Sequence, residues 1–137
     1  MSVELNHTLV HVRDIWAAAR EVGTVLGRPE PTPYGPFAVL HLDNGASLDF
    51  LEDTGEIQAQ HYAFLVGEDD FDAIWRRIRE QGRTFWADPF KQQPDRINHN
   101  DGGRGLYWDG PDGHWLEIIT RPYGGGVPIG TTESETP

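Results

Sequence analysis

Two histidines and two carboxylates occupy matching places in the two halves of this chain. His7 lies in a strand-like stretch that opens the first half, and Asp49 follows a glycine by four residues near its end. His61 and Glu117 stand at the corresponding points of the second half, and a valine follows each of the two histidines by five residues. Imidazole and carboxylate groups at repeated positions are typical of a pseudo-symmetric metal site.

The composition limits which metal and which partners such a site could have. The 137 residues include no cysteine, so disulfides, thiolate ligands and a cysteine nucleophile are excluded. A metal would have to be held by imidazole and carboxylate, which suits Fe(II), Mn(II), Zn(II) or Ni(II). The net charge of -11, with one lysine, argues against nucleic acid and anionic membrane as partners. No apolar run approaches transmembrane length and no signal pattern opens the chain, so we expect a cytoplasmic protein that binds a small molecule.

The two halves repeat one order of elements. The first half is expected to contain a strand over 4–12, a helix from Asp14 to about Val25, an irregular edge at 29–36, and a hairpin. That hairpin joins strands over 37–42 and 47–52. The second half is expected to contain a strand over 57–66, a helix capped by Asp69 or Asp70, a short strand over 84–87, a loop over 89–103, and a hairpin of 104–109 with 114–120.

This order predicts a single α+β domain over residues 1–122, built from two modules of about 3–53 and 57–121. A helix covers only one face of each small sheet, so the other faces must meet each other or enclose a cavity. Strand alternation places His7, Asp49, His61 and Glu117 on those uncovered faces. The segment 123–137 is rich in Gly, Pro and acidic residues and is expected to be a disordered tail.

The stretches around three of these residues carry a family resemblance. They read LNHTLV around His7, QHYAFLV around His61 and PDGHWLEIIT around Glu117. Over roughly residues 3–121 the doubled pattern resembles the vicinal oxygen chelate superfamily, which includes glyoxalase I, extradiol dioxygenases, and fosfomycin-resistance and bleomycin-binding proteins. The resemblance implies two βαβββ modules that form a cupped mixed sheet with the helices on its outer face. It also implies a divalent ion on His7, His61 and Glu117, with Asp49 as a candidate fourth ligand.

A second resemblance favours ring-cleaving chemistry. Ile97-Asn98-His99, six residues, Leu106-Tyr107 and the turn that leads to Glu117 are similar to the C-terminal pattern of extradiol dioxygenases. The match implies that His99 is the acid/base histidine and that Tyr107 hydrogen-bonds the substrate oxygen. Gly110 departs from the pattern, those dioxygenases are usually longer, and a counterpart of their other second-sphere histidine is missing.

Further residues are candidates for the walls of a substrate pocket. His11 shares a face with His7, and Trp115 shares one with Glu117, while Arg104 could hold an anionic group. For His11, a pocket-wall or second-shell position is favoured over a place among the metal ligands. The structural alternatives are core packing for Trp115 and a solvated charge for Arg104. An inward, solvated carboxylate is the alternative for Asp49, and an exposed, inert histidine is the alternative for His99. The remaining histidines, His41 and His114, are expected to be structural.

We therefore predict a small metal-dependent enzyme whose ion chelates neighbouring oxygens of an aromatic or hydroxylated substrate. In the extradiol version the ion is Fe(II), with Mn, Ni or Zn as alternatives. A second hypothesis is a glyoxalase-type isomerase, lyase or thiol transferase that uses the ion as a Lewis acid. Fosfomycin chemistry is disfavoured because the chain has few cations for a phosphonate. A third hypothesis is a metal-free drug-binding or resistance dimer. Relatives with two modules imply a homodimer, in which modules could be exchanged between chains.

Overall fold

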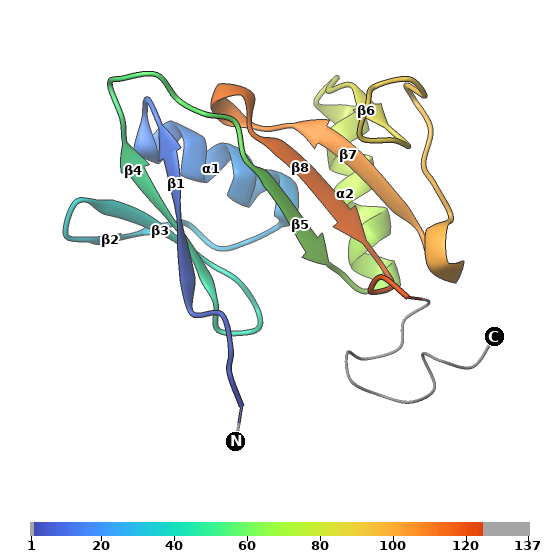
Figure 1. The fold of residues 1–137 in the computed structure, drawn as a ribbon, viewed down its shortest axis with the longest axis horizontal. Helices are drawn as coiled ribbons and strands as arrows, with labels where there is room; N and C mark the ends of the chain where they lie inside the picture. Colours follow the sequence, from blue (N-terminus) through green and yellow to red (C-terminus); the bar gives the residue numbers. More distant parts are fainter. Residues whose placement is uncertain (1, 125–137) are drawn as a thin grey trace. The chain divides into compact units, whose positions relative to one another are not determined.

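The computed structural model describes residues 2–124, and the chain within it forms two compact units (Figure 1). The first unit contains the chain up to Ala59 and the short segment 110–113. The second contains residues 60–109 and the chain from His114 onward. All but the first two residues of the predicted disordered tail lie outside the described residues.

The first unit is a four-stranded mixed sheet with one helix. Its elements are β1 (His7–Val12), α1 (Ile15–Leu26), β2 (Thr32–Tyr34), β3 (Phe37–His41) and β4 (Ser47–Glu52). The strand order is β1-β4-β3-β2; β1 runs parallel to β4 and the other pairs are antiparallel. The Asp43-Asn44-Gly45 turn joins β3 to β4 as predicted, and Gly45 has the positive φ of 86° that such a turn requires.

The second unit repeats the same topology. Its elements are β5 (His61–Leu65), α2 (Glu68–Glu80), β6 (Phe85–Trp86), the 3₁₀ turn η1 (Asn100–Gly102), β7 (Gly105–Asp109) and β8 (Trp115–Ile119). The strand order is β5-β8-β7-β6, again with one parallel pair, β5 with β8. The turn η2 (Pro111–Gly113), which joins β7 to β8, belongs to the first unit. The predicted α+β class with two βαβββ modules is therefore confirmed.

Both parallel edge strands begin later than the hydrophobic pattern predicts. We expected strands over 4–12 and 57–66, but β1 starts at His7 and β5 at His61. The reason lies in the partner strands, because β4 begins at Ser47, opposite His7, and β8 begins at Trp115, opposite His61. One more backbone bond forms on each side, from the Ser47 amide to the Asn6 carbonyl and from the Trp115 amide to the Gln60 carbonyl. Residues before Asn6 and Gln60 have no partner strand opposite them, so their extended sequence does not become a strand.

The N-termini of the two helices are capped in different ways. The Asp14 side chain accepts a hydrogen bond from the Ala17 amide at 3.0 Å, which confirms the predicted cap of α1. Our expectation that Asp69 or Asp70 caps α2 is wrong: the capping residue is Gly67, which has no side chain to accept a bond. Both aspartates lie in the first turn of α2, where they still favour the helix through its dipole.

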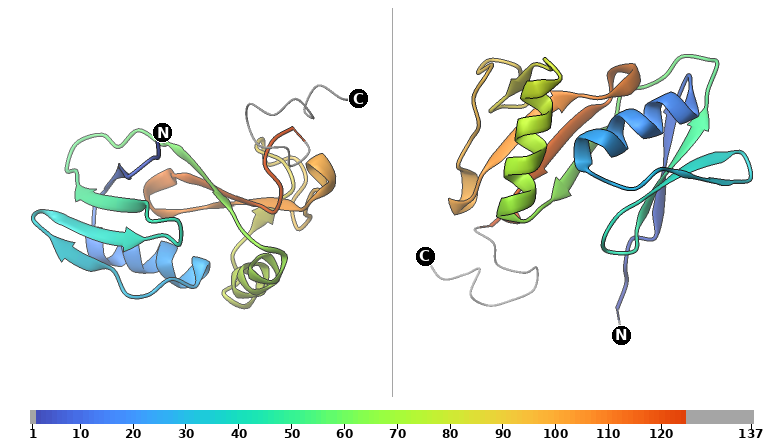
Figure 2. Two further views of the ribbon diagram at one scale, coloured as in Figure 1. Left: turned by 90° about the horizontal axis from the view of Figure 1, so that it is seen from below. Right: turned by 180° about the vertical axis from the view of Figure 1, so that it is seen from behind.

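Each helix leaves one face of its sheet uncovered (Figure 2). In the first sheet, Val10, Val12, Leu48 and Phe50 are buried on the side of α1. His7, Leu9 and His11 alternate with them and lie on the open side. Across residues 2–124, no helix is both long enough and apolar enough to cross a membrane.

The two helix caps give a test of this part of the structure. Replacing Asp14 with Ala should lower the free energy of unfolding by about 1 kcal/mol, since the Ala17 amide loses its acceptor. Asp69→Ala is the matched control, and it should cost only a few tenths of a kcal/mol because it removes a dipole contact but no cap. Urea unfolding of both variants measures the difference; equal losses would contradict the assignment of Asp14 as the cap.

Candidate functional site

A histidine and a buried acid meet on the open face of the second sheet. Trp115 lies opposite His61 in the parallel register, and Glu117 is two residues further along β8 on the same face. The glutamate side chain is long enough to span this diagonal, and its Oε1 lies 3.0 Å from His61 Nε2. Glu117 is 2% exposed, so its carboxylate needs partners of this kind.

The orientation of the His61 ring is fixed by a second contact. Its Nδ1 lies 3.0 Å from the Trp115 carbonyl oxygen, which only accepts hydrogen bonds, so Nδ1 carries a proton. This leaves Nε2 directed at Glu117 Oε1. A histidine whose outer nitrogen is held by a backbone carbonyl is the usual arrangement of a metal-ligating imidazole. The pair His61 and Glu117 therefore fits the donor chemistry of an imidazole and carboxylate metal site.

Tyr107 completes this group from the neighbouring strand β7. It pairs directly with Glu117 in the antiparallel register, and its phenol donates a hydrogen bond to that carboxylate. Burial raises the pKa of Tyr107 far above its ordinary value, and the charge of Glu117 raises the same pKa further. Tyr107 is thus a hydrogen-bond donor throughout the physiological pH range.

An aromatic layer continues from this group toward the edge of the sheet. The His61 ring stacks on Tyr107 with centroids 6.0 Å apart, and Tyr107 stacks on Trp115 at 5.6 Å. Trp115 then contacts Trp86 of β6 at 5.4 Å. Lys91 Nζ lies 4.9 Å from both indole rings and 3.0 Å from the Asp109 carboxylate. Trp115 therefore lines the same face as Glu117, as its alternation predicted.

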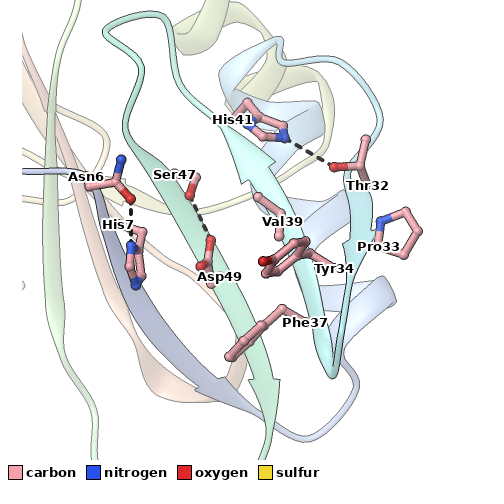
Figure 3. Close-up of a pocket in the computed structure, with 10 residues that line it drawn as sticks. All are labelled: Asn6, His7, Thr32, Pro33, Tyr34, Phe37, Val39, His41, Ser47 and Asp49. Atoms are coloured by element: carbon pink, nitrogen blue, oxygen red, sulfur yellow. Dashed lines mark hydrogen bonds between the residues drawn. The ribbon is translucent and has the colours of Figure 1, made fainter.

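The corresponding residues of the first sheet are arranged differently. Asp49 occupies the position of Glu117, two residues beyond the residue opposite His7, and is 9% exposed. Its Oδ1 accepts a hydrogen bond from Ser47 Oγ at 2.7 Å, while His7 Nδ1 contacts Asn6 Oδ1 at 2.7 Å (Figure 3). These same residues line a cavity of about 430 Å³.

The predicted ligand set is thus divided between the two units. His61 and Glu117 are in contact, whereas His7 and Asp49 lie on the first sheet. Among residues 2–124, no three His, Asp or Glu side chains are gathered closely enough to hold a metal ion. The parts of His7 and Asp49 in the ligand set remain predictions.

Two further candidates lie in exposed positions. Asn98 bridges Gly105, two residues before Tyr107, so the neighbouring His99 lies at that end of β7. His99 is exposed, and within residues 2–124 its side chain forms no hydrogen bond, ion pair or ring contact. His11 on the first sheet lies 3.3 Å from the Asp53 carboxylate. The acid/base role of His99 and the substrate contact of His11 remain predictions.

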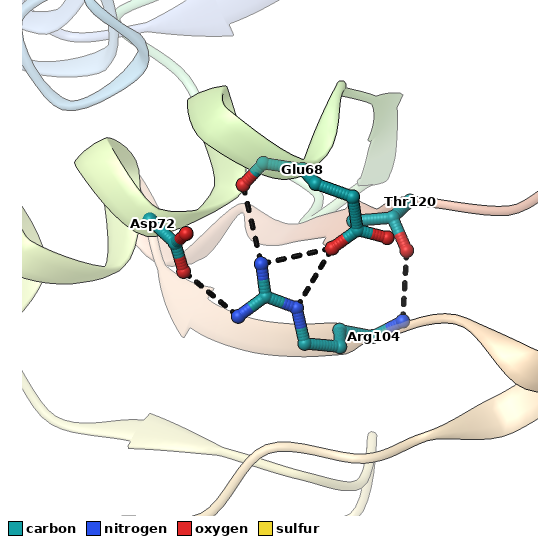
Figure 4. A network of polar contacts seen from close by, with 4 residues as sticks. All are labelled: Glu68, Asp72, Arg104 and Thr120. Atoms are coloured by element: carbon teal, nitrogen blue, oxygen red, sulfur yellow. Dashed lines mark hydrogen bonds and ion pairs between the residues drawn. The ribbon is translucent and has the colours of Figure 1, made fainter.

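The structure argues against Arg104 as a substrate-binding residue. Its guanidinium forms ion pairs of 2.8 Å with both Glu68 and Asp72 of α2 (Figure 4). The guanidinium carbon also lies 4.4 Å from the centre of the Phe71 ring. These contacts place the side chain on the helix-covered side of the sheet, away from Glu117. Arg104 is therefore a structural link between β7 and α2.

Of the two histidines expected to be structural, His114 is buried and accepts a hydrogen bond from the Gln60 amide.

The comparisons with known proteins agree with the fold. No model of a protein family matches the sequence. The fosfomycin resistance protein FosX from Mesorhizobium loti is 20% identical, with a TM-score of 0.64 over 90% of this chain and 96% of that one. A glyoxalase/bleomycin resistance protein from Catenulispora acidiphila is 24% identical, with a TM-score of 0.62 over 87% of this chain and 100% of that one. At these identities the likeness shows the fold alone.

Closer relatives show the family. The oxidase ChaP-H1 is 57% identical over 90% of this chain and 100% of its own, with a TM-score of 0.88, and the oxidase ChaP-H2 is 56% identical with a TM-score of 0.89. The chain belongs to the vicinal oxygen chelate superfamily. The glutathione transferase FosA of Serratia marcescens is 38% identical over 58 residues, which are 42% of this chain and 34% of FosA.

Several residues on the open faces of the two sheets were not identified from the sequence. Trp86 and Lys91 were not recognised as neighbours of Trp115, because a two-residue strand and a loop carry no periodicity. Val39 and His41 alternate onto the same face as Asp49, so strand register could have placed them beside it. His41 contacts Thr32 Oγ1 at 3.1 Å and lines the cavity.

The raised pKa of Tyr107 predicts a loss of stability at high pH. An unfolded tyrosine ionises near pH ~10, whereas folded Tyr107 ionises at higher pH. The stability that Tyr107 contributes is therefore fully present below pH ~10 and is lost as the pH rises above that value. Tyr107→Phe should make unfolding less sensitive to pH in this range. An equally steep loss of stability in the variant would contradict the assignment.

The Arg104 network gives a second test. Arg104→Gln should lower the free energy of unfolding by about 1 kcal/mol, because two ion pairs and a ring contact are lost. It should leave the substrate KM unchanged. Arg96→Gln removes the same charge from an exposed position and serves as the control. A raised KM with unchanged stability would return Arg104 to the substrate site.

Proposed function

We propose that this chain is a metal-dependent oxidative enzyme whose ion is held by His61, Glu117 and His7. The observation that carries the proposal is the contact between His61 Nε2 and Glu117 Oε1 at 3.0 Å, with the ring held by the Trp115 carbonyl. The high identity to two proteins named oxidases supports an oxidative reaction. Fe(II) is the ion we favour, because two imidazoles with one carboxylate are the ligand set of many oxygen-using iron enzymes.

A bound ion would supply a Lewis-acidic centre with open positions for neighbouring oxygens of the substrate. Tyr107, held in its protonated form by burial, would donate a hydrogen bond to a substrate oxygen on which negative charge develops. His99 would take up and return a proton at a substrate hydroxyl, as the extradiol resemblance implies. The stacked Tyr107 and Trp115 rings form the wall of the site and exclude water from the buried Glu117.

A second candidate is thiol transfer or isomerisation with the ion as a Lewis acid. The local similarity to FosA favours it. A phosphonate substrate fits poorly, because Lys91, the cation nearest the aromatic layer, is already paired with Asp109. Turnover of an α-ketoaldehyde with glutathione and Ni(II) or Zn(II), in place of oxygen consumption with Fe(II), would select this candidate.

The quaternary state and location belong to the same proposal. We infer a homodimer in the cytoplasm, in which His7 of one chain could complete the ligand set of another. Sedimentation of the metal-loaded protein tests the dimer, and mixing His7→Ala with His61→Ala chains tests exchange. If neither parent holds metal but the mixture does, the ligand set is shared between chains.

Metal content gives the direct test of the ligand assignment. The protein loaded with Fe(II) under anaerobic conditions should retain stoichiometric metal after desalting. His61→Ala and Glu117→Gln should each weaken metal binding by about tenfold or more, because each removes a ligand atom. His99→Ala is the control histidine, and it should keep the metal but lower oxygen consumption with catechols.

The possible outcomes separate the hypotheses. Wild-type metal content in both His61→Ala and Glu117→Gln would remove the proposed site. A wild-type protein that never holds stoichiometric metal would instead favour the metal-free binding protein. Loss of metal in His99→Ala would contradict a proton-transfer role for that residue.

A further inference from the structure

The open face of the first sheet carries a pocket of which the proposed chemistry uses only His7. Its lining includes alternate residues of β3 and β4, which lie on the side away from α1, together with Asn6, His7 and three consecutive residues of β2 (Figure 3). The cavity of about 430 Å³ is within the range of small-molecule sites. Asp49 lies in the pocket with only 9% of its surface exposed.

Comparison of the two sheets explains why the pocket exists. Around Glu117 the second sheet carries Tyr107 as the antiparallel partner and Trp115 two residues earlier on the strand. At the same register around Asp49, the first sheet carries Val39 and Ser47. Two large aromatic side chains of the second sheet are thus replaced by small ones in the first, which leaves space unfilled. The first sheet therefore has a pocket at the positions where the second sheet has stacked rings.

Around Asp49 the free polar atoms of this pocket accept hydrogen bonds. Ser47 donates its only hydroxyl proton to Asp49 Oδ1, which leaves Asp49 Oδ2 and the serine lone pairs for a ligand. None of the ten lining residues is Lys or Arg, so no permanent positive charge offsets the Asp49 carboxylate when the ligand is an anion. Pro33, Tyr34 and Phe37 provide an apolar wall beside these acceptors.

We propose that this pocket binds the hydroxyl-bearing part of a neutral organic substrate, with Asp49 and Ser47 as the residues that accept its hydroxyl protons. That the bound molecule is a substrate rests on the proposed function, but the binding itself does not. The assignment makes Asp49 a specificity residue and removes it from the metal ligand set, because its Oδ1 is already bonded to Ser47. It also predicts that ligands with carboxylate or phosphonate groups are rejected.

The test uses the full chain in the presence of a chelator, so that metal is not required. Nitrogen-15 NMR follows the amides of Ser47, Asp49 and Val39 while catechol or cyclohexane-1,2-diol is added, with benzoate and phenylphosphonate as anionic probes. The diols should shift these amides and the anions should not. Asp49→Asn should weaken diol binding about tenfold, the usual cost of losing one charge-assisted hydrogen bond. Asp69→Asn makes the same chemical change on α2 and should bind the diols as the wild type does.

A refilled pocket gives an independent variant if Asp49→Asn does not fold. Val39→Tyr copies the residue that the second sheet carries at the same register, so it should fold and abolish diol binding. Thermal unfolding confirms that each variant is folded. Unchanged diol binding in Val39→Tyr or Asp49→Asn, or equal binding of the anions, would overturn the proposal. Loss of bound Fe(II) in Asp49→Asn would return Asp49 to the metal ligands and would overturn it as well.

These outcomes are separate from those of the proposed function. If the diols bind but no metal supports turnover, the oxidative reaction fails and the pocket stands. If the enzyme oxidises catechols while diols leave the three amides unmoved, the pocket assignment fails and the reaction stands.

Discussion

The contact between His61 and Glu117 depends on the register of one parallel strand pair. Because Trp115 lies opposite His61, the acid two residues later falls on the same face and on the diagonal that a glutamate can span. A shift of this register by one residue would turn Glu117 toward the helix side, where a carboxylate has no such partner. The Trp115 carbonyl that orients the His61 ring belongs to the same strand pair. The backbone register therefore sets both the position and the ring orientation of the pair.

The first sheet keeps this register but not this contact. Asp49 is one methylene shorter than Glu117, and it bonds to Ser47 on its own strand in place of the neighbouring histidine. The aromatic partners of Glu117 are replaced by Val39 and Ser47, and a pocket takes their place. A duplicated backbone has thus acquired two different faces through changes at three positions that contact one another. One face brings two candidate metal ligands into contact, and the other carries a cavity.

The repeat made the fold predictable, because each half confirmed how the other should be interpreted. The matched spacing of His7 and Asp49 with His61 and Glu117 indicated two equivalent modules, and alternation indicated their open faces. Strand ends were less predictable, since β1 and β5 begin where a partner strand begins and not where apolar residues do. The ion pairs of Arg104 were not predicted, because sequence gives no means to see that Glu68 and Asp72 of α2 lie within reach of it. The pocket depends on cross-strand neighbours, and pairing of Val39 with Asp49 becomes visible only once the register is known.

The burial of Glu117 is the strongest physical reason to assign a function to the second face. A carboxylate that is 2% exposed loses most of its hydration, and a histidine and a tyrosine return only part of that free energy. An apolar side chain at this position would pack against Tyr107 and Trp115 at lower cost. The same three groups, an oriented imidazole, a buried carboxylate and a protonated phenol, are those that a metal and an oxygen-rich substrate would require. The face is therefore less stable than it could be, and its arrangement is explained by ligand binding better than by folding.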